Sequence, residues 1–496
     1  MTSHSEPKAK NPMVKITADG KVIEAPKGGN LLKALLDNGV SVPHYCYHPG
    51  LSVAGCCRMC FVEVEGQPRP LISCNATVTE NMVVKTQTET VKNIQKWNLA
   101  FHLINHPLDC PICDQAGECG LQNYYMQFGK YESRMEEEKV KKRKVIPIGD
   151  HVMLDTERCI LCSRCVRFFD EVPKTSEMAI FNRGDRSEIG TYEDKALNNN
   201  YTLNSVDICP VGALTSRDFR FKRRVWFLKD IPSICPGCST GCNVTISQDP
   251  IEKRTYRMRP RFNEEVNGYW MCDYGRMRYK HTHRESRIST PLIKKAATLI
   301  PTEWDETKHE LFTIFKTPAS QISVLITPQY TSEDITHIYD FFTKTIGTQN
   351  IFHCADSHLA SDSTVTDELL FRRDKNPNSQ GLLKISAHYK LQEQNLSLFQ
   401  QKLKSDPWTI LFIFGPHDLE AYPEFLSWFK ENNSLKTKIY IGTQVKHQIP
   451  LFDLLLPTLT FIETEGTFVN FKGLSQKLSR GVKLIPEAKP ICEILC

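Results

Sequence analysis

The chain has 496 residues, 40% hydrophobic and 24% charged, which is enough for several globular domains with cores of their own. Its 62 basic residues nearly balance its 57 acidic ones, so the charge gives no indication of nucleic-acid binding. No apolar run approaches the ~20 residues of a membrane-spanning helix. The first twelve residues lack the apolar stretch of a signal peptide and the arginines of a transit peptide. We therefore expect an intracellular protein that does not itself span a membrane.

Residues 1–95 are expected to form a small β-rich domain. Residues 14–25 alternate in polarity around a turn at Asp19 and Gly20, which predicts a hairpin. Asn30 is placed to cap a helix over residues 31–36, and a strand is predicted at residues 61–64. A hairpin, a helix and a cysteine-bearing loop together indicate a β-grasp ferredoxin.

Four groups of metal-ligand residues lie between positions 46 and 272. Fifteen of the nineteen cysteines, with one histidine, form them: Cys46, Cys57, Cys60 and Cys74; His106, Cys110, Cys113 and Cys119; Cys159, Cys162, Cys165 and Cys209; Cys235, Cys238, Cys242 and Cys272. In a reducing compartment, so many cysteines indicate metal and not disulfides. Thiolates at such spacings hold iron–sulfur clusters. The chain is thus predicted to carry a row of redox centres.

His106 belongs to an H-x3-C-x2-C-x5-C pattern that follows a helix predicted at residues 89–104. The alternative is a solvated histidine beside Pro107, with the fourth ligand elsewhere. This group has only three thiolates nearby, and a neutral imidazole suits iron, so we assign His106 as the fourth ligand. Because imidazole leaves the cluster less negative than a thiolate would, this centre should be easier to reduce than an all-thiolate one.

The third group has three cysteines at short, equal intervals, and its fourth member, Cys209, precedes Pro210. This pattern is typical of bacterial ferredoxins. Zinc usually combines two C-x2-C pairs, so zinc is an alternative mainly for the last group. A two-cluster ferredoxin would have four further cysteines, but those positions hold Phe169, Asn199, Thr202 and Ser205. We therefore expect one cluster in this segment.

Beyond residue 300, strands alternate with helices, which indicates a parallel α/β layer. Strands are predicted at residues 323–326, 410–414, 438–441 and 453–456, and helices from Ser332 to about residue 345 and near 422–430. No G-x-G-x-x-G or P-loop follows these strands, so a nucleotide site has no local support.

The chain resembles the large iron–sulfur subunit of respiratory complex I, the NADH–quinone oxidoreductase. The matching stretches are residues 43–46, 55–60 (GCCRMC), 106–120 (HPLDCPICDQAGECG), 158–167 (RCILCSRCVR), 206–214, 267–273 and 463–470. The resemblance implies a multidomain α+β and α/β protein: a 2Fe–2S β-grasp domain (1–95), a 4Fe–4S segment with one histidine and three cysteine ligands (96–145), a 4Fe–4S ferredoxin-like domain (146–226), a 4Fe–4S molybdopterin-oxidoreductase-type domain (227–285) and a shortened α/β domain without pterin (286–496).

The resemblance also implies roles. The first group would hold a 2Fe–2S cluster, and the other three would each hold a 4Fe–4S cluster, the last lying off the main electron path. Electrons from NADH would arrive through flavin on a partner subunit and continue toward quinone, with no substrate site on this chain. Partners would be the flavin- and NADH-binding subunit and other peripheral-arm subunits, with membrane-arm contact only through the quinone module. The location would be the cytoplasmic face of a bacterial inner membrane, or the matrix side in a mitochondrion.

Other kinds of protein share parts of this pattern. A molybdenum-dependent formate dehydrogenase would need a protein ligand to the metal, and Cys354 is the candidate, although a small buried residue at a strand end is the simpler interpretation. An iron-only hydrogenase would keep the second ferredoxin cluster, and a binding protein with decayed sites would not keep all the ligands. Cys56 is interpreted as a bystander in the first loop, and Cys492 and Cys496 as surface residues of the tail.

Overall fold

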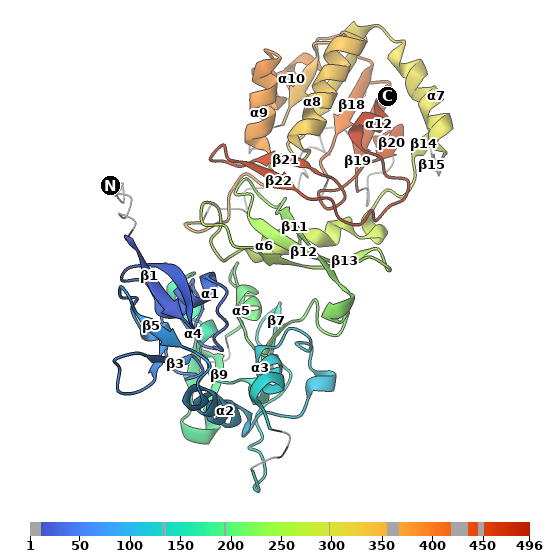
Figure 1. The fold of residues 1–496 in the computed structure, drawn as a ribbon. Helices are drawn as coiled ribbons and strands as arrows, with labels where there is room; N and C mark the ends of the chain where they lie inside the picture. Colours follow the sequence, from blue (N-terminus) through green and yellow to red (C-terminus); the bar gives the residue numbers. More distant parts are fainter. Residues whose placement is uncertain are drawn as a thin grey trace. The chain divides into compact units, whose positions relative to one another are not determined.

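The computed structural model describes residues 11–130, 132, 135–192, 195–296, 298–354, 367–417, 435–444 and 451–496. The chain divides into two compact units, Met1–Trp226 and Phe227–Cys496 (Figure 1). Over the described residues, none of the helices combines the length and the apolar composition needed to cross a bilayer.

A five-stranded sheet and one helix form the beginning of unit 1. In sheet order the strands are β2 (Lys21–Pro26), β1 (Met13–Ala18), β5 (Val83–Lys85), β3 (Phe61–Val64) and β4 (Leu71–Ile72). Strands β1 and β2 are antiparallel, whereas β1 and β5 are parallel. Helix α1 (Leu31–Asp37) begins where the Asn30 side chain accepts a hydrogen bond from the Lys33 N–H at 3.0 Å. The predicted hairpin, cap, helix and strand are confirmed.

The rest of unit 1 consists of short elements joined by loops. The helices are α2 (Glu89–Leu103), α3 (Gly120–Phe128), α4 (Arg164–Glu171) and α5 (Asn204–Asp207). The strands are β6 (Ile146–Pro147), β7 (Val152–Leu154) and β10 (Leu214–Ser216) in one sheet, and β8 (Met178–Phe181) with β9 (Glu188–Thr191) in a hairpin. The predicted helix over residues 89–104 is confirmed as α2. Its first turn is capped by the Thr88 hydroxyl, which accepts from the Val91 N–H.

The described residues of unit 2 form two sheets and a hairpin. The first sheet is antiparallel, with β11 (Lys229–Ile234), β12 (Asn243–Asp249) and β13 (Arg254–Pro260), followed by α6 (Asp273–Arg276). The second has seven strands in the order β15 (Thr298–Pro301), β14 (Leu292–Lys295), β20 (Leu454–Pro457), β19 (Thr437–Gly442), β18 (Ile410–Phe414), β16 (Ile322–Ile326) and β17 (Ile351–His353). The described residues of unit 2 also form α7 (Trp304–Phe315), α8 (Ser332–Asp340), α9 (Ser379–His388), α10 (Leu396–Lys402), β21 (Gly466–Val469), β22 (Ser475–Leu478) and α12 (Ile491–Ile494).

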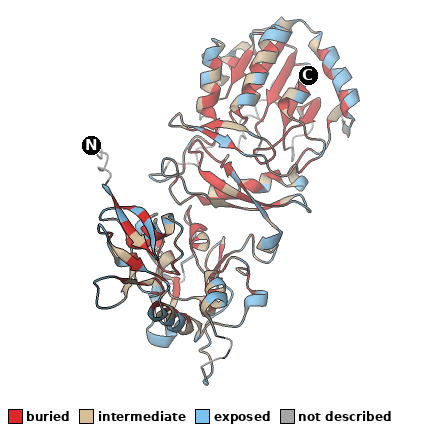
Figure 2. Cartoon of the chain, in the orientation of Figure 1, coloured by how far each residue is buried: buried red, intermediate tan, exposed pale blue. Residues whose placement is uncertain are grey.

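The central strands of the large sheet are buried on both faces (Figure 2). Side chains of β18 alternate between two cores: Phe412 and Phe414 pack in one, and Leu411 and Ile413 in the other. From β20 to β17 the strands run parallel, so the predicted α/β layer is confirmed.

The predicted helix from Ser332 to about residue 345 differs in detail from the observed one. Its cap is Thr331, whose hydroxyl accepts from the Asp334 N–H, and a π-helical turn (Phe341–Ile346) replaces its last part. The helix predicted near 422–430 lies outside the described residues.

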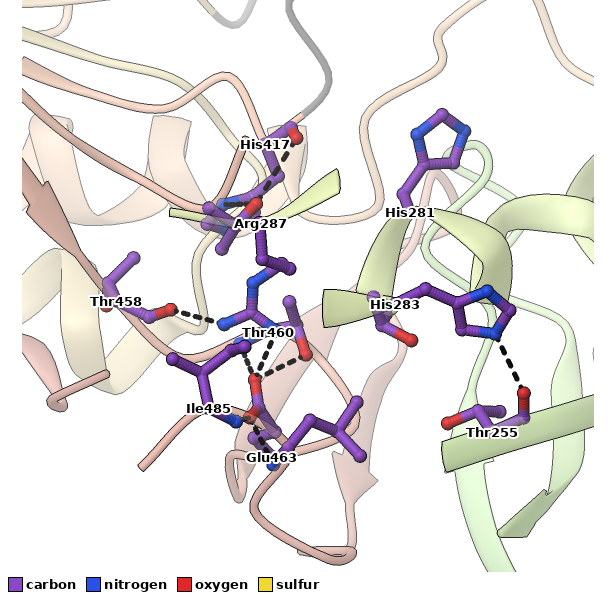
Figure 3. A network of polar contacts seen from close by, with 12 residues as sticks. Thr255, His281, His283, Arg287, His417, Thr458, Thr460, Glu463 and Ile485 are labelled. Atoms are coloured by element: carbon purple, nitrogen blue, oxygen red, sulfur yellow. Dashed lines mark hydrogen bonds and ion pairs between the residues drawn. The ribbon is translucent and has the colours of Figure 1, made fainter. Parts of the chain in front are cut away.

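A fully buried ion pair ties segments of unit 2 together (Figure 3). Arg287 donates to the Glu463 carboxylate at 2.9 Å and to the Thr458 carbonyl at 3.0 Å. Glu463 also accepts from the backbone N–H groups of Leu484 (2.7 Å) and Ile485 (3.2 Å). The ion pair and these hydrogen bonds offset the desolvation cost of burying the carboxylate.

Replacing Arg287 with methionine should leave the Glu463 charge buried without its partner. We expect R287M to lower the free energy of unfolding of the full chain by about 3–5 kcal/mol in a urea titration. The control, K295M, removes the exposed Lys295–Glu306 pair and should leave the free energy close to that of the unmodified chain. Equal losses in the two variants would show that the buried pair has no special role.

Candidate metal centres

The first group gathers on the loop between α1 and β3 and on the turn after β4. The Cys46 sulfur accepts hydrogen bonds from the thiols of Cys56, Cys57 and Cys74, which hold its pKa far below the usual range. The Cys74 thiol also lies within hydrogen-bonding reach of Cys60, and this contact lowers the pKa of Cys60 to about 7. The four cysteines of the group are at most 4% exposed. Cys56 is exposed but belongs to this network, a role that the sequence pattern did not reveal.

The second group lines a cavity of about 820 Å³ between residues of α2 and α3. His106, Cys110, Cys113 and Cys119 all contribute to its wall. Burial, with the nearby Arg158 and Lys139, lowers the pKa of His106 to about 4, so the imidazole is neutral at physiological pH. Its Nδ1 atom is buried and has no hydrogen-bond partner in the described part of the chain. A neutral imidazole with a free nitrogen is what a metal ligand requires.

The third group surrounds a small cavity of about 20 Å³, lined by all four of its cysteines. Leu161 and Ser163, on either side of Cys162, have left-handed backbone conformations, with φ of 52° and 58°. Non-glycine residues seldom adopt this conformation, so the tight loop is held by its surroundings. Burial raises the pKa of the Cys162 thiol to about 11. Deprotonation of these thiols to thiolates is therefore unfavourable unless a cation is bound beside them.

The fourth group lies in unit 2, and each of its cysteines is at most 4% exposed. The N–H groups of Gly237 and Gly275 donate to the sulfurs of Cys235 and Cys272, both at 3.4 Å. A Cβ atom at Gly275 would lie 2.7 Å from the Cys235 sulfur, so this close approach requires glycine.

Lys375 also faces the fourth group, although it is far along the chain. Burial lowers the pKa of Lys375 to about 8, while the nearby Cys238 and Cys272 act in the opposite direction. Nothing in the sequence around Lys375 indicated this position, since only the tertiary structure brings it to the cysteines.

Residues of three groups share one hydrophobic core within unit 1. Cys46 and Cys57 of the first group, Cys119 of the second and Cys162 of the third are buried in it, and Cys159 and Cys209 pack against it. Gly212 lies where this core meets the second group, and a Cβ atom there would be 2.3 Å from the Cys113 sulfur. The three groups are therefore near neighbours, separated by side chains and not by solvent.

Tyr45 is fully buried in this shared core. Its ring packs edge-on against His102, with the ring centres 5.0 Å apart, and lies 5.3 Å from Tyr124. Its hydroxyl is buried and has no hydrogen-bond partner among the described residues. Buried polar groups in proteins are nearly always paired, so this hydroxyl needs a further partner.

The donor groups fit iron–sulfur clusters by their chemistry. All nineteen cysteines are free thiols, and most are buried. Thiolate sulfur and neutral imidazole are the ligands that iron–sulfur clusters take. The unpartnered atoms of His106 and Tyr45 lie beside these thiols, as expected where a cofactor completes the site. The described residues contain no His, Cys, Asp or Glu group arranged to hold one metal ion, so the assignment rests on donor chemistry and surroundings.

Cys354 lies apart from the four groups. It follows β17, is 1% exposed, and packs with Leu325, Phe352 and Leu411 in the core of the large sheet. This placement is that of a small apolar residue and gives no support to a role as a molybdenum ligand. Cys496 is exposed and Cys492 is half-buried.

Replacing Tyr45 with phenylalanine tests whether a cluster is the missing partner of its hydroxyl. Removing a hydrogen bond to cluster sulfur disfavours the reduced, more negative state. We therefore expect Y45F to lower the midpoint potential of the first or second centre in an EPR-monitored redox titration. The control Y389F removes a hydroxyl that binds Asp340 in unit 2 and should leave both potentials in place. Unchanged potentials in Y45F would refute the assignment.

Five family models match the chain in order. They are described as a 2Fe-2S iron-sulfur cluster binding domain (residues 11–89), the NADH-ubiquinone oxidoreductase-G iron-sulfur binding region (95–134), the ferredoxin-like domain of NADH-quinone oxidoreductase subunit 3 (149–215), the molybdopterin oxidoreductase Fe4S4 domain (228–284) and molybdopterin oxidoreductase (386–496). This order confirms the predicted fold class and shows domains for both 2Fe–2S and 4Fe–4S clusters.

Curated relatives are similar over most of the chain. The G-type subunit of NADH-quinone oxidoreductase from Streptomyces coelicolor is 38% identical over 71% of this chain and 42% of its own length. The NADH-ubiquinone oxidoreductase 75 kDa subunit of Reclinomonas americana is 41% identical over 59% of this chain and 42% of its own. The mitochondrial NADH dehydrogenase [ubiquinone] iron-sulfur protein 1 of Solanum tuberosum is 42% identical over 57% of this chain and 38% of its own length. The matches thus cover about two fifths of these relatives, and they do not favour the formate dehydrogenase alternative.

A solved structure of an NAD+-reducing [NiFe]-hydrogenase in the H2-reduced state also matches, with 29% identity and a TM-score of 0.38. The match covers 43% of this chain and 91% of that one.

Proposed function

We propose that this chain, a homologue of the large iron–sulfur subunit of NADH–quinone oxidoreductase, carries electrons between partner subunits of such a complex. The observation that carries the proposal is the hydrophobic core in unit 1 that three donor groups share. Iron–sulfur clusters, when bound, supply reversible one-electron transfer.

The ligand assignment is part of the proposal. We assign Cys46, Cys57, Cys60 and Cys74 to a 2Fe–2S cluster, and three 4Fe–4S clusters to His106, Cys110, Cys113 and Cys119; to Cys159, Cys162, Cys165 and Cys209; and to Cys235, Cys238, Cys242 and Cys272. The segment boundaries are proposed after residues 95, 145, 226 and 285. The division of the structure between Trp226 and Phe227 supports the third of these.

The residues around the donor groups have two tasks in this function. Apolar side chains such as Met59, Leu99 and Leu121 keep water from the sulfurs. Backbone N–H groups donate to sulfur, as Tyr45 does to Cys57 at 3.4 Å and Leu161 to Cys159 at 3.3 Å. Hydrogen bonds to sulfur and exclusion of water are the means by which a protein sets a cluster's reduction potential.

The proposed partners and location follow from what the relatives are. Electrons would enter from a flavin- and NADH-binding subunit and leave toward quinone through other peripheral subunits. The complex would lie at the cytoplasmic face of a bacterial inner membrane, or on the matrix side in a mitochondrion. The relatives named as subunits of NADH–quinone oxidoreductase support this arrangement.

Iron and acid-labile sulfide analysis of the anaerobically purified chain tests the assignment. One 2Fe–2S and three 4Fe–4S clusters should give about fourteen irons per chain, two plus twelve, and a matching amount of sulfide. EPR after reduction with dithionite should separate the 2Fe–2S signal from the 4Fe–4S signals. About four metals per chain, all zinc, would refute the proposal. Molybdenum or pterin would support a formate dehydrogenase instead.

Replacing His106 with cysteine tests the mixed ligand set. A thiolate in place of the neutral imidazole adds negative charge, so H106C should keep the cluster but lower its midpoint potential. The matched control is H102C. His102 is also half-buried nearby, but it contacts the carbonyl of Cys57 in the first group at 3.1 Å. H102C should therefore leave the midpoint potential of the second centre unchanged. An unchanged potential in H106C would show that His106 is not a ligand.

A further inference from the structure

We propose that Arg164 and Arg167 form a clamp that fixes the separation of the first and third donor groups for electron transfer. The inference rests on the proposed function, because the clamp matters only if both groups hold redox centres. The two arginines are positioning residues: both act through the backbone that carries the ligands.

Arg164 joins the two groups directly. It is the first residue of α4, next to Cys165 of the third group. Its guanidinium donates to the carbonyl of Ile208, at 3.0 Å, and to the carbonyl of Tyr47. Ile208 precedes the ligand Cys209, and Tyr47 follows the ligand Cys46. One planar fork therefore holds the backbone beside a ligand of each group.

Arg167 repeats this pattern one helical turn later. Its guanidinium donates to the carbonyl of Cys46 at 2.5 Å and to that of Cys162 at 3.5 Å. It also donates to the carbonyl of Ser52. A third side chain of α4, Glu171, accepts from the Ser52 backbone N–H at 2.8 Å and from its hydroxyl at 2.5 Å. One face of α4 therefore holds the loop of the first group along its length.

The loop has no regular secondary structure, so its position depends on side-chain contacts such as those of α4 and on its buried residues, Tyr45 and Met59 among them. Between the end of α1 at Asp37 and the start of β3 at Phe61, the chain forms neither helix nor strand. Loops of this length without secondary structure are usually functional and depend on side-chain contacts for their shape. The electron-transfer rate between centres falls steeply with their separation, so this loop must be held in place.

The charge of the clamp also faces both groups. Arg164 lies among the sulfurs of Cys162, Cys209 and Cys46, and their charge, when they are thiolates holding a cluster, would offset the cost of its burial. Arginine stays protonated at physiological pH even when buried. A fixed positive charge between two centres favours their reduced, more negative states. The clamp is thus expected to have two separate effects: its hydrogen bonds fix the distance between the two centres, and its positive charge raises their reduction potentials.

The experiment compares R164K, R164M and R167M in the full, cluster-loaded chain. Lysine keeps the charge of Arg164 but cannot hold two carbonyls in a planar fork. We expect R164K to weaken the magnetic coupling between the reduced first and third centres in EPR relaxation measurements, while their midpoint potentials stay close to wild type. R164M should weaken the coupling and also lower both potentials. R167M should weaken the coupling, because the Cys46 and Ser52 carbonyls lose their donor.

The matched control is R217M, since Arg217 also donates to a backbone carbonyl, that of Gly149 at 2.9 Å, on the surface of unit 1. It should leave the coupling and potentials unchanged. Should R164M lose iron, R164K and R167M still decide the question. Wild-type coupling in both R164K and R167M, with full iron content, would overturn the clamp. A wild-type chain without cluster signals would refute the proposed function instead.

Discussion

Burial of cysteine sulfur is the constraint on which the rest of this structure depends. A buried thiolate is unfavourable by itself, and a buried thiol contributes only as a small apolar group. Here three groups of sulfur ligands meet in one core, beside a neutral imidazole and a tyrosine hydroxyl that have no partners among the described residues. A bound cluster would satisfy these groups together, because iron would neutralise the thiolates and cluster sulfur would accept hydrogen bonds.

The fold meets this constraint differently in its two units. In unit 1 most of the proposed ligands lie on loops and short turns, and α4, which contains Cys165, binds backbone carbonyls of these loops through its side chains. Unit 2 has a large parallel sheet with its own cores and a buried Arg287–Glu463 pair. There Cys235 and Cys242 are part of a separate core, with Ile234, Val244 and Met258. The two cores of the large sheet therefore contain none of the proposed ligand cysteines, whereas one core of unit 1 is built around them.

Local patterns in the sequence were enough to predict many elements, whereas the ligand groups that they indicate stay a prediction. The spacing between cysteines indicates loops that bring several cysteines together. Alternating polarity around turn residues predicted the hairpin of β1 and β2. Contacts between segments far apart in the sequence could not be predicted in this way. The guanidinium of Arg164 binds a carbonyl 117 positions earlier, and no local pattern indicates that pair. The same holds for Lys375 beside the fourth group, for the buried hydroxyl of Tyr45 and for the core shared by three groups.

Amide hydrogen exchange of the full chain, before and after anaerobic removal of iron by a chelator, tests the central claim most directly. If bound clusters stabilise the buried thiolates, removal of iron should lower the protection of backbone amides in the loops at residues 41–60, 106–120 and 159–165. Protection in strands β16 and β18 of unit 2 should persist, since their cores contain no ligand cysteine. Equal protection of the loops with and without iron would contradict the account.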